Sequence, residues 1–277
     1  MQLGGDYLEA GLPNLGNTCF INAVVQMLRY GTPLIEAVRV LPLAYGRGTV
    51  IGDFIELLFQ HPRVEVLRRF VATLRKRCPD AQEDATQAVY ETLDMLTTCP
   101  VATDPPMKRL LEDVMYYEVT TRVACRGCGA VTDTVERTPL WSLPVGRGED
   151  LATALSRWEQ EQVLTGENKF DCASCGGLRD ATRTQLLTRC PPLCLVHVLT
   201  PHLTVSLTAP LKMTMGGAAR VCCGVVSHRG TPRHGHYVCH VKTRSGWRLC
   251  NDATVRDDEV KHLRSVSAYV LAFVAEP

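Results

Sequence analysis

The chain lacks several features that would place it in a specialised class. No run of apolar residues approaches the roughly 18 that cross a membrane, and no charged-then-apolar signal sequence opens the chain. Neither sign of charge dominates, because 30 Lys and Arg balance 29 Asp and Glu to a net charge of +1. This balance argues against a dedicated nucleic-acid surface. Because the chain has neither a membrane-spanning run nor an excess of positive charge, we expect no membrane or nucleic-acid partner. Repeats, low-complexity tracts and flexible linkers are also absent.

Cysteine, in contrast, is abundant, with 13 residues in a chain of 277. Disulfides form in oxidising compartments, and the absence of a secretory signal makes a disulfide framework a poor interpretation. The cysteines therefore indicate a reducing compartment, the cytoplasm or the nucleus, and thiols that bind metal or take part in catalysis. With 45% hydrophobic residues the chain can also bury a sizeable core, as one large domain or two small ones.

Four of the cysteines form two pairs with the same spacing, Cys125-x2-Cys128 and Cys172-x2-Cys175, and a glycine follows each pair. Such glycines suit the tight turns that present two sulfurs to one ion. Four thiolates make a closed tetrahedral zinc site with no open position for water. We therefore expect one structural Zn²⁺ at these four residues and no catalytic cofactor. Two separate redox motifs are the alternative interpretation.

The apolar periodicity predicts helices in the first hundred residues and strands in the last hundred. This order favours an α+β enzyme with segregated regions over a doubly wound sheet. The predicted helices cover residues 20–29, 54–59, 64–74, 80–96 and 150–163, and the predicted strands cover 114–123, 131–137, 193–199, 221–226, 236–242, 247–250 and 268–274.

Residues 11–22, with the sequence Gly-Leu-Pro-Asn-Leu-Gly-Asn-Thr-Cys-Phe-Ile-Asn, read as a tight loop that delivers one cysteine to the start of a helix. Thr18 is a plausible N-cap, which would place Cys19 in the first turn. The unpaired N–H groups and the positive end of the helix dipole favour a thiolate there. A buried and unreactive cysteine is the alternative.

A second stretch near the other end of the chain offers partners for this cysteine. His236 begins a predicted strand after a glycine-marked loop, and Asn251-Asp252 ends the next strand. A hairpin would place the two side by side. A cysteine nucleophile needs an imidazole as its base, and a carboxylate or amide that fixes the imidazole tautomer. An exposed histidine beside an ordinary Asn-Asp loop is the other interpretation.

Together these stretches resemble the ubiquitin-specific protease family of deubiquitinating enzymes. Residues 11–22 resemble its cysteine box, and Gly235-His236-Tyr237, followed by Trp247 and by Asn251-Asp252-x-x-Val255, resembles its histidine box. The segment Gln82-Glu83-Asp84-Ala85 is similar to the glutamine–aspartate segment between the boxes. The paired cysteines fall where the family has its zinc site, and residues 268–271 resemble its closing strand.

This resemblance implies a role for each matching residue. Cys19 would be the nucleophile, His236 the general base and then acid, and Asn251 the group that orients the imidazole. Asp252 would be an auxiliary polar group near the oxyanion, and Asn14 the side-chain donor of the oxyanion hole. The expected substrate contacts are Asp84, which would engage an arginine in the ubiquitin tail, together with Gln82, Tyr237 and Gly235.

The resemblance also implies a fold, a papain-like cysteine protease shaped as a hand. Residues 1–277 would form a single catalytic domain, with a helical thumb (1–113), zinc-tipped β fingers with an adjoining helix (114–190) and a β-rich palm (191–277). The implied activity is thiol-dependent hydrolysis after the C-terminal glycine of ubiquitin, with ubiquitin and ubiquitinated proteins as partners. A protease for another ubiquitin-like modifier and a non-catalytic ubiquitin-binding module are the alternatives.

Two positions depart from the family pattern. Thr86-Gln87-Ala88 stand where the family often has His-Glu-Phe, and residues 198–202 replace its basic-aromatic strand ending. Both lie near the expected substrate contacts.

Overall fold

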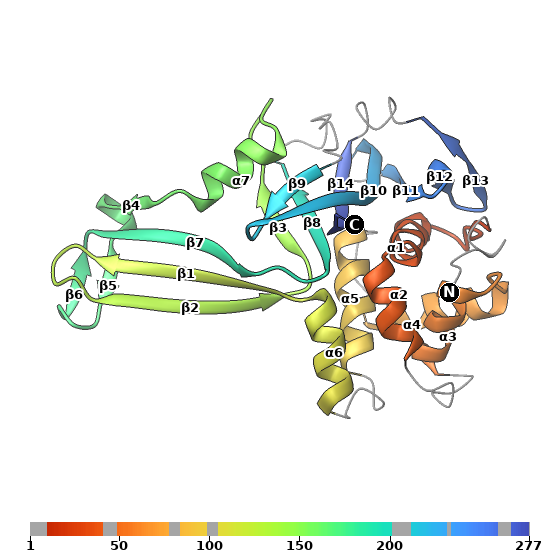
Figure 1. Cartoon of the computed structure of the whole chain (residues 1–277), viewed down its shortest axis with the longest axis horizontal. Helices are drawn as coiled ribbons and strands as arrows, with labels where there is room; N and C mark the ends of the chain where they lie inside the picture. The colour runs from red at the N-terminus through yellow and green to blue at the C-terminus, as the bar shows by residue number, and fades with distance from the viewer. Residues whose placement is uncertain are drawn as a thin grey trace.

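The computed structural model describes residues 10–40, 49–77, 84–98, 105–200, 212–231, 234–259 and 267–276. Most of the helices precede most of the strands, which confirms the predicted α+β class. The first six helices form one block beside a large sheet, and a second, longer sheet projects away from both (Figure 1). Among the described residues no helix is long and apolar enough to cross a membrane.

The helical block contains the nucleophile-candidate helix and the helices that surround it. The first of these, α1, is buried along its whole length, because other helices cover one side of it and strands of the large sheet cover the other. The block consists of α1 (Cys19–Arg29), α2 (Thr32–Arg39), α3 (Val50–Phe59), α4 (Val64–Arg77), α5 (Ala85–Thr98) and α6 (Pro105–Met115).

Helix predictions were confirmed for α1, α3 and α4, but two helices were not predicted. Pro33 reads as a break, yet it lies in the first turn of α2, where the missing N–H needs no partner. Residues 114 and 115, predicted as strand, instead end α6, where Leu111 and Met115 are buried one helical turn apart. The predicted start at Asp80 lies outside the described residues.

The large sheet forms the platform on which α1 lies. Its strand order is β13-β12-β11-β10-β14-β8-β3, and β9 pairs with β10. All pairs are antiparallel except β3 with β8. The strands are β3 (Trp141–Pro144), β8 (Leu193–Leu199), β9 (Lys212–Met215), β10 (Ala218–Thr231), β11 (His234–Thr243), β12 (Gly246–Asn251), β13 (Thr254–Asp258) and β14 (Ala268–Ala275). The five predicted strands from 193 onward are confirmed, whereas β3, β9 and β13 were not predicted.

The projecting sheet has the order β2-β1-β7-β4 and carries a small hairpin, β5-β6, at its far end (Figure 1). The prediction of a helix over residues 150–163 was wrong at its end. Helix α7 stops at Glu159, and residues 162–164 pair with β7 as a strand. The elements are β1 (Tyr117–Cys125), β2 (Val131–Thr138), α7 (Leu151–Glu159), β4 (Gln162–Leu164), a 3-10 turn (Gly166–Asn168), β5 (Phe170–Cys172), β6 (Gly177–Arg179) and β7 (Ala181–Arg189).

Two apolar cores lie on opposite faces of the large sheet. The first joins the helical block to one face, where Cys239 and Val241 of β11 meet α1. The second lies on the other face, where Trp141 and Trp158 stack edge to face with ring centroids 5.0 Å apart. The sheet is thus fixed from both sides, and this holds α1 at a defined height above it.

Gly224 of β10 sets how closely α1 approaches the sheet. A Cβ atom at this position would lie 2.9 Å from Cγ of the buried Met27. We predict that Gly224→Ala lowers the free energy of unfolding by about 1–3 kcal/mol, because overpacking forces side chains or backbone to shift. Urea unfolding followed by circular dichroism would measure the loss. Adding Met27→Ala should recover the steric part, so strict additivity of the two losses would contradict this explanation.

Candidate active site and zinc centre

The loop that precedes α1 is organised by the side chain of Asn14. Its Oδ1 accepts hydrogen bonds from the backbone N–H groups of Gly16, at 3.0 Å, and Thr18, at 3.2 Å. Gly16 and Asn17 both have positive φ angles, 90° and 50°. The chain therefore turns tightly just before Cys19, as the sequence predicts.

Thr18 occupies the position before α1, but it does not cap the helix with its side chain. Its hydroxyl instead accepts a bond from the N–H of Leu15 at 2.9 Å and lies 3.4 Å from Oδ1 of Asn14. The prediction of a capping threonine is thus wrong. Because the hydroxyl serves the loop, the first N–H groups of the helix are not satisfied by it.

Cys19 is the first residue of α1 and is only 5% exposed. The first N–H groups of a helix have no acceptor within the helix, and its positive end favours an anion. The start of a helix is thus a position that generally favours a thiolate over a thiol.

Asp252 connects this loop to the turn between β12 and β13. Its Oδ2 accepts a bond from Nδ2 of Asn14 at 2.9 Å, and its Oδ1 accepts one from Nδ2 of Asn22 at 2.8 Å. Its backbone carbonyl accepts the N–H of Leu12 at 2.9 Å. A Cβ atom on Gly11 would lie 2.3 Å from the carbonyl of Ala253, so only glycine permits this close approach. Loop, helix and turn are therefore held as one unit.

Asn22 is a residue of this unit that sequence analysis did not single out. It is 2% exposed, and its amide also donates to the carbonyl of Leu12 at 3.1 Å. The available signal was a polar residue one turn after the cysteine, on the same helix face as Gln26 and Arg29. Only the structure shows that it faces the Asp252 turn.

His236 and Asn251 lie together as predicted. Nε2 of His236 is 2.7 Å from Oδ1 of Asn251, the last residue of β12. An amide oxygen only accepts, so Nε2 carries the proton and donates it. The other ring nitrogen, Nδ1, then has the free lone pair that a general base requires.

Packing brings the strand of His236 to the helix of Cys19. Helix α1 packs against β11 and β12, and Cys19 shares the first core with Tyr237, the neighbour of His236. Burial, with smaller contributions from the charges of Asp84 and Cys19, raises the pKa of the Tyr237 phenol. The structure thus brings the segments that carry Cys19 and His236 together.

Asp84 lies at the start of α5 beside a cluster of aromatic rings. Its Oδ1 accepts the N–H of Thr86 at 2.8 Å, and both carboxylate oxygens are 3.0 Å from the hydroxyl of Tyr269. The ring of Tyr269 lies 5.6 Å from that of Tyr237. Burial and the Asp84 charge raise the pKa of Tyr269, which keeps its hydroxyl a donor. Sequence analysis did not connect Tyr269 with Asp84, and no spacing signal could have done so.

His228 explains why residue 235 is a glycine. A Cβ atom there would lie 1.8 Å from Nε2 of the buried His228. The His228 ring in turn contacts the ring of Tyr237, with centroids 4.6 Å apart. Burial lowers the pKa of His228, which keeps this ring uncharged at neutral pH. Gln82, the remaining expected contact, lies outside the described residues.

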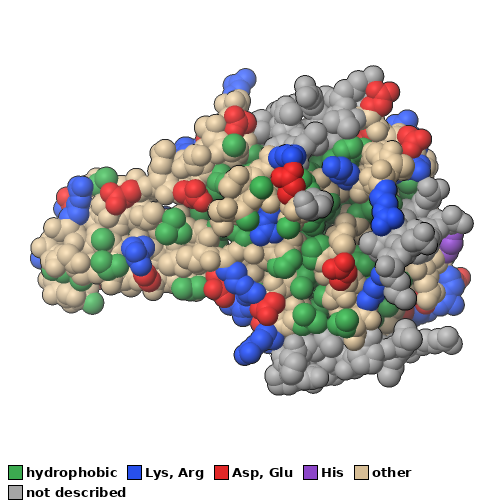
Figure 2. Space-filling model, viewed as in Figure 1, with side chains coloured by type: hydrophobic (Ala, Val, Ile, Leu, Met, Phe, Trp, Pro, Cys, Tyr) green, Lys and Arg blue, Asp and Glu red, His purple; other side chains and the backbone are tan. Residues whose placement is uncertain are grey.

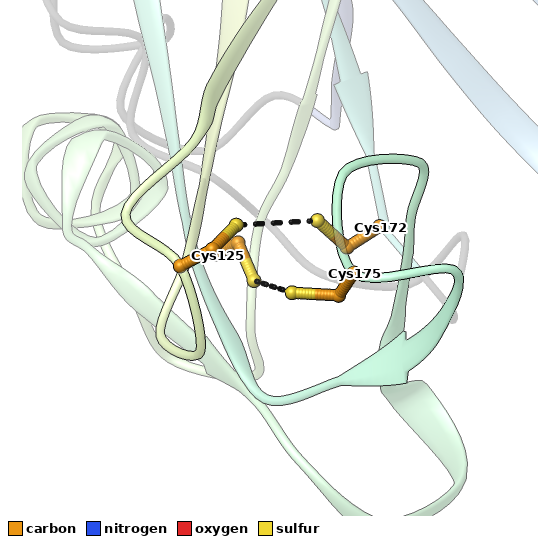
Figure 3. Close-up of side chains that lie close together, drawn as sticks. Cys125, Cys172 and Cys175 are labelled. Carbon is orange, nitrogen blue, oxygen red and sulfur yellow. Dashed lines mark hydrogen bonds between the residues drawn. The ribbon is translucent and has the colours of Figure 1, made fainter.

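The four paired cysteines gather at the far end of the projecting sheet. Their sulfurs all lie within 4.8 Å of one another, with Cys125 and Cys175 at 3.9 Å and Cys128 and Cys172 at 3.6 Å. Figure 3 shows the sulfurs of Cys125, Cys172 and Cys175 turned toward a common centre. The donor set and its closeness fit a structural zinc ion.

The protonation of these thiols also fits a cation. The backbone N–H groups of Cys128 and Gly127 lower the pKa of Cys125 to about 7, despite opposing desolvation. Hydrogen bonds with the neighbouring thiols, Cys128 first, raise the pKa of Cys175 to about 12. Four adjacent thiols cannot all ionise without a compensating positive charge, and a bound metal ion replaces their protons.

A cysteine at a helix start, a histidine held by an amide and a separate cluster of four thiols are together typical of cysteine proteases that carry a structural zinc site. The family model described as "Ubiquitin carboxyl-terminal hydrolase" matches residues 10–202 and 222–273. The chain belongs to this family.

Known relatives extend the match to nearly the whole chain. Ubiquitin carboxyl-terminal hydrolase 23 of Arabidopsis thaliana is 26% identical over 315 residues, which cover 97% of this chain and 36% of the relative. Human ubiquitin carboxyl-terminal hydrolase 42 is 25% identical, over 96% of this chain and 23% of its own length. The chain thus spans well under half the length of these relatives.

A solved structure with the same fold is the SAGA Ubp8/Sgf11/Sus1/Sgf73 deubiquitinase module bound to ubiquitin aldehyde. It superimposes with a TM-score of 0.82 at 16% identity, over all of this chain and 72% of the other. A yeast SAGA module with an Sgf73 variant gives a TM-score of 0.77 at 18% identity. These matches confirm the hand-like fold that the resemblance implied.

We predict that the chain carries one zinc ion and that Cys172→Ser abolishes its binding. Loss of the metal should loosen the projecting sheet, because the free energy of metal binding stabilises the folded state of this region. Metal analysis by mass spectrometry, with limited proteolysis of residues 117–189, would measure both effects. Cys190→Ser, a cysteine outside the cluster, is the control and should retain the zinc. Full zinc content in Cys172→Ser would rule out this site.

Proposed function

We propose that this chain is a thiol-dependent deubiquitinase that hydrolyses the peptide or isopeptide bond after the C-terminal glycine of ubiquitin. The observation that carries the proposal is the family match across residues 10–202 and 222–273, which includes Cys19, His236 and Asn251. The hydrogen bond between His236 and Asn251, at 2.7 Å, supports the same conclusion.

In the proposed reaction, His236 accepts the Cys19 proton on Nδ1, and the thiolate attacks the carbonyl carbon of the last ubiquitin glycine. The tetrahedral intermediate collapses to a thioester, and the imidazolium returns its proton to the departing amine. Water, deprotonated by His236, then hydrolyses the thioester. The side-chain oxygen of Asn251 holds the imidazole by accepting a hydrogen bond from its Nε2–H, and this stabilises the imidazolium as it forms.

Asn14 is the proposed donor to the developing oxyanion. One hydrogen of its Nδ2 serves Asp252, and the other remains for substrate. A preorganised donor of this kind contributes about 3 kcal/mol in comparable sites. In this view Asp252 acts on the oxyanion site by orienting Asn14.

Asp84 is the proposed contact for an arginine in the ubiquitin tail. Its carboxylate accepts bonds from Tyr269 and Thr86, which hold it in one orientation for a guanidinium. Tyr237 and Gly235, beside His228, are proposed to line the path of the tail, and Gln82 is a further proposed contact. Thr86, which stands at one of the two positions that depart from the family pattern, thus donates a hydrogen bond that orients Asp84.

The projecting sheet offers a surface for a folded partner. Val131, Val135, Val163 and Leu186 are 41–57% exposed, and the strand register places them on one face. Figure 2 shows apolar and charged side chains interspersed along this projection. Exposed apolar faces of this kind mark protein contacts, which supports ubiquitin and ubiquitinated proteins as partners.

We further propose that residues 1–277 act as one catalytic unit, divided into a thumb (1–113), fingers (114–190) and a palm (191–277). The free thiols of the described cysteines support a reducing compartment, the cytoplasm or nucleus.

A ubiquitin probe with a C-terminal electrophile tests the activity. We predict that the wild-type chain forms one covalent adduct, seen as a mass shift, and that Cys19→Ala forms none. Cys190→Ala, a thiol outside the proposed site, should label at the wild-type rate. Binding without labelling would contradict the proposal and favour a non-catalytic module. Labelling only by a probe built on another ubiquitin-like modifier would also contradict it.

A second prediction concerns Asp84. Asp84→Asn keeps the shape and the acceptor oxygen but removes the charge, so KM for ubiquitin substrates should rise about 10–100-fold, equivalent to about 1.4–2.7 kcal/mol. The turnover number should change little, because tail binding is retained in the transition state. With ubiquitin whose tail arginines are replaced by leucine, Asp84→Asn should have no further effect. An unchanged KM would remove Asp84 from the substrate site.

A further inference from the structure

A second histidine of β11, His240, lies four residues after His236 and has its own hydrogen-bonded partners. Its Nδ1 is 2.6 Å from Oδ2 of Asp258, and its Nε2 is 3.3 Å from Oγ of Ser227. This Ser227–His240–Asp258 trio has the connectivity of a serine-hydrolase triad. Its members come from β10, β11 and β13.

Burial excludes a second hydrolytic site. Ser227 is 0% exposed, and the side chains of His240 and Asp258 are 2% and 5% exposed. A substrate carbonyl could not reach the Ser227 hydroxyl. The role of the trio therefore lies within the protein, and it depends on which strands these hydrogen bonds join.

The trio joins strands that are not neighbours in the sheet. The order β13-β12-β11-β10 places β12 between Asp258 and His240, so the 2.6 Å contact reaches across that strand. Among the described residues, β13 is an edge strand whose one pairing partner is β12. The Asp258–His240 bond thus fastens the base of the β12–β13 hairpin to β11.

The tip of the same hairpin carries Asn251 and Asp252. Backbone pairing between β11 and β12 ends at Cys239 and Cys250, so it does not extend to His236 and Asn251. The contact that joins those two residues is a side-chain hydrogen bond. Its length depends on how the hairpin is inclined toward β11, and the hairpin is held at its tip by Asp252 and at its base by Asp258.

We propose that the Ser227–His240–Asp258 trio is a positioning device that holds the β12–β13 hairpin so that Asn251 meets Nε2 of His236. Its role in turnover rests on the proposed function above. Its role in orienting the His236 ring does not depend on the identity of the substrate.

The sharpest variant is Asp258→Asn, with Asp257→Asn as its matched control. Asp257 is the adjacent residue in the same strand, but its side chain is 91% exposed and pairs with Arg248. Asp258→Asn should lower kcat for ubiquitin substrates by roughly tenfold or more, since a displacement of about 1 Å can cost about a hundredfold. KM should stay within about twofold, because the trio does not touch the substrate. Asp257→Asn should match the wild type in both.

Nitrogen NMR of the His236 ring gives a readout that a purely structural role would not change. In the wild type Nε2 should be the protonated nitrogen, as the Asn251 acceptor requires. In Asp258→Asn the ring should shift toward a mixture of tautomers. A wild type that hydrolyses no ubiquitin would defeat the proposed function, yet this measurement would still decide the role of the trio.

Thermal unfolding separates positioning from stability. If Asp258→Asn lowers only the melting temperature, with kcat and the His236 tautomer unchanged, the trio merely stabilises the fold and the proposal is wrong. If Asp258→Asn fails to fold, Ser227→Ala, which removes only the weaker 3.3 Å bond, takes its place. The same two readouts then apply to it, with a smaller expected effect of the same sign.

Discussion

The carboxylate of Asp252 is the contact on which the candidate active site depends. It accepts bonds from Asn14 in the loop and Asn22 in the helix, while its own backbone accepts the N–H of Leu12. These groups lie more than 200 positions away in the chain, yet one side chain fixes their distance from Asn251. Hydrogen bonds to a charged acceptor are stronger than those between neutral groups. The contacts of Asp252 therefore fix the position of Cys19 relative to His236.

The packing of the large sheet keeps the Asp252 contacts in place. Gly224 lets α1 lie close to the strands, and two cores clamp the sheet from both faces. The Ser227–His240–Asp258 trio fixes the base of the β12–β13 hairpin in a similar way. Asp252 holds the tip of the hairpin and Asp258 holds its base, so the two acidic residues define its orientation at both ends.

The projecting sheet is stabilised differently because it has little core of its own. Strand β2 is exposed along nearly its whole length. At the near end, the buried Tyr117 anchors β1 by donating to the carbonyl of Leu195, at 3.1 Å. At the far end the four thiols perform the same task, with metal binding in place of apolar burial. This division leaves the faces of the sheet between them available to a partner.

Local chemistry allowed the sequence alone to determine the thiol pairs, the helix that starts at Cys19 and the hairpin of His236 and Asn251. Each depends on residues close together in the chain, such as Gly16 before the helix or the glycines after the cysteine pairs. The edge strand β13, helix α6 and the contacts of Asn22, His228 and Tyr269 depended on the tertiary structure. Those features arise from segments that meet only after folding, and residue spacing along the chain carries no record of which distant groups will face one another. Most residues of the candidate site could therefore be proposed from the sequence, and packing decided their geometry.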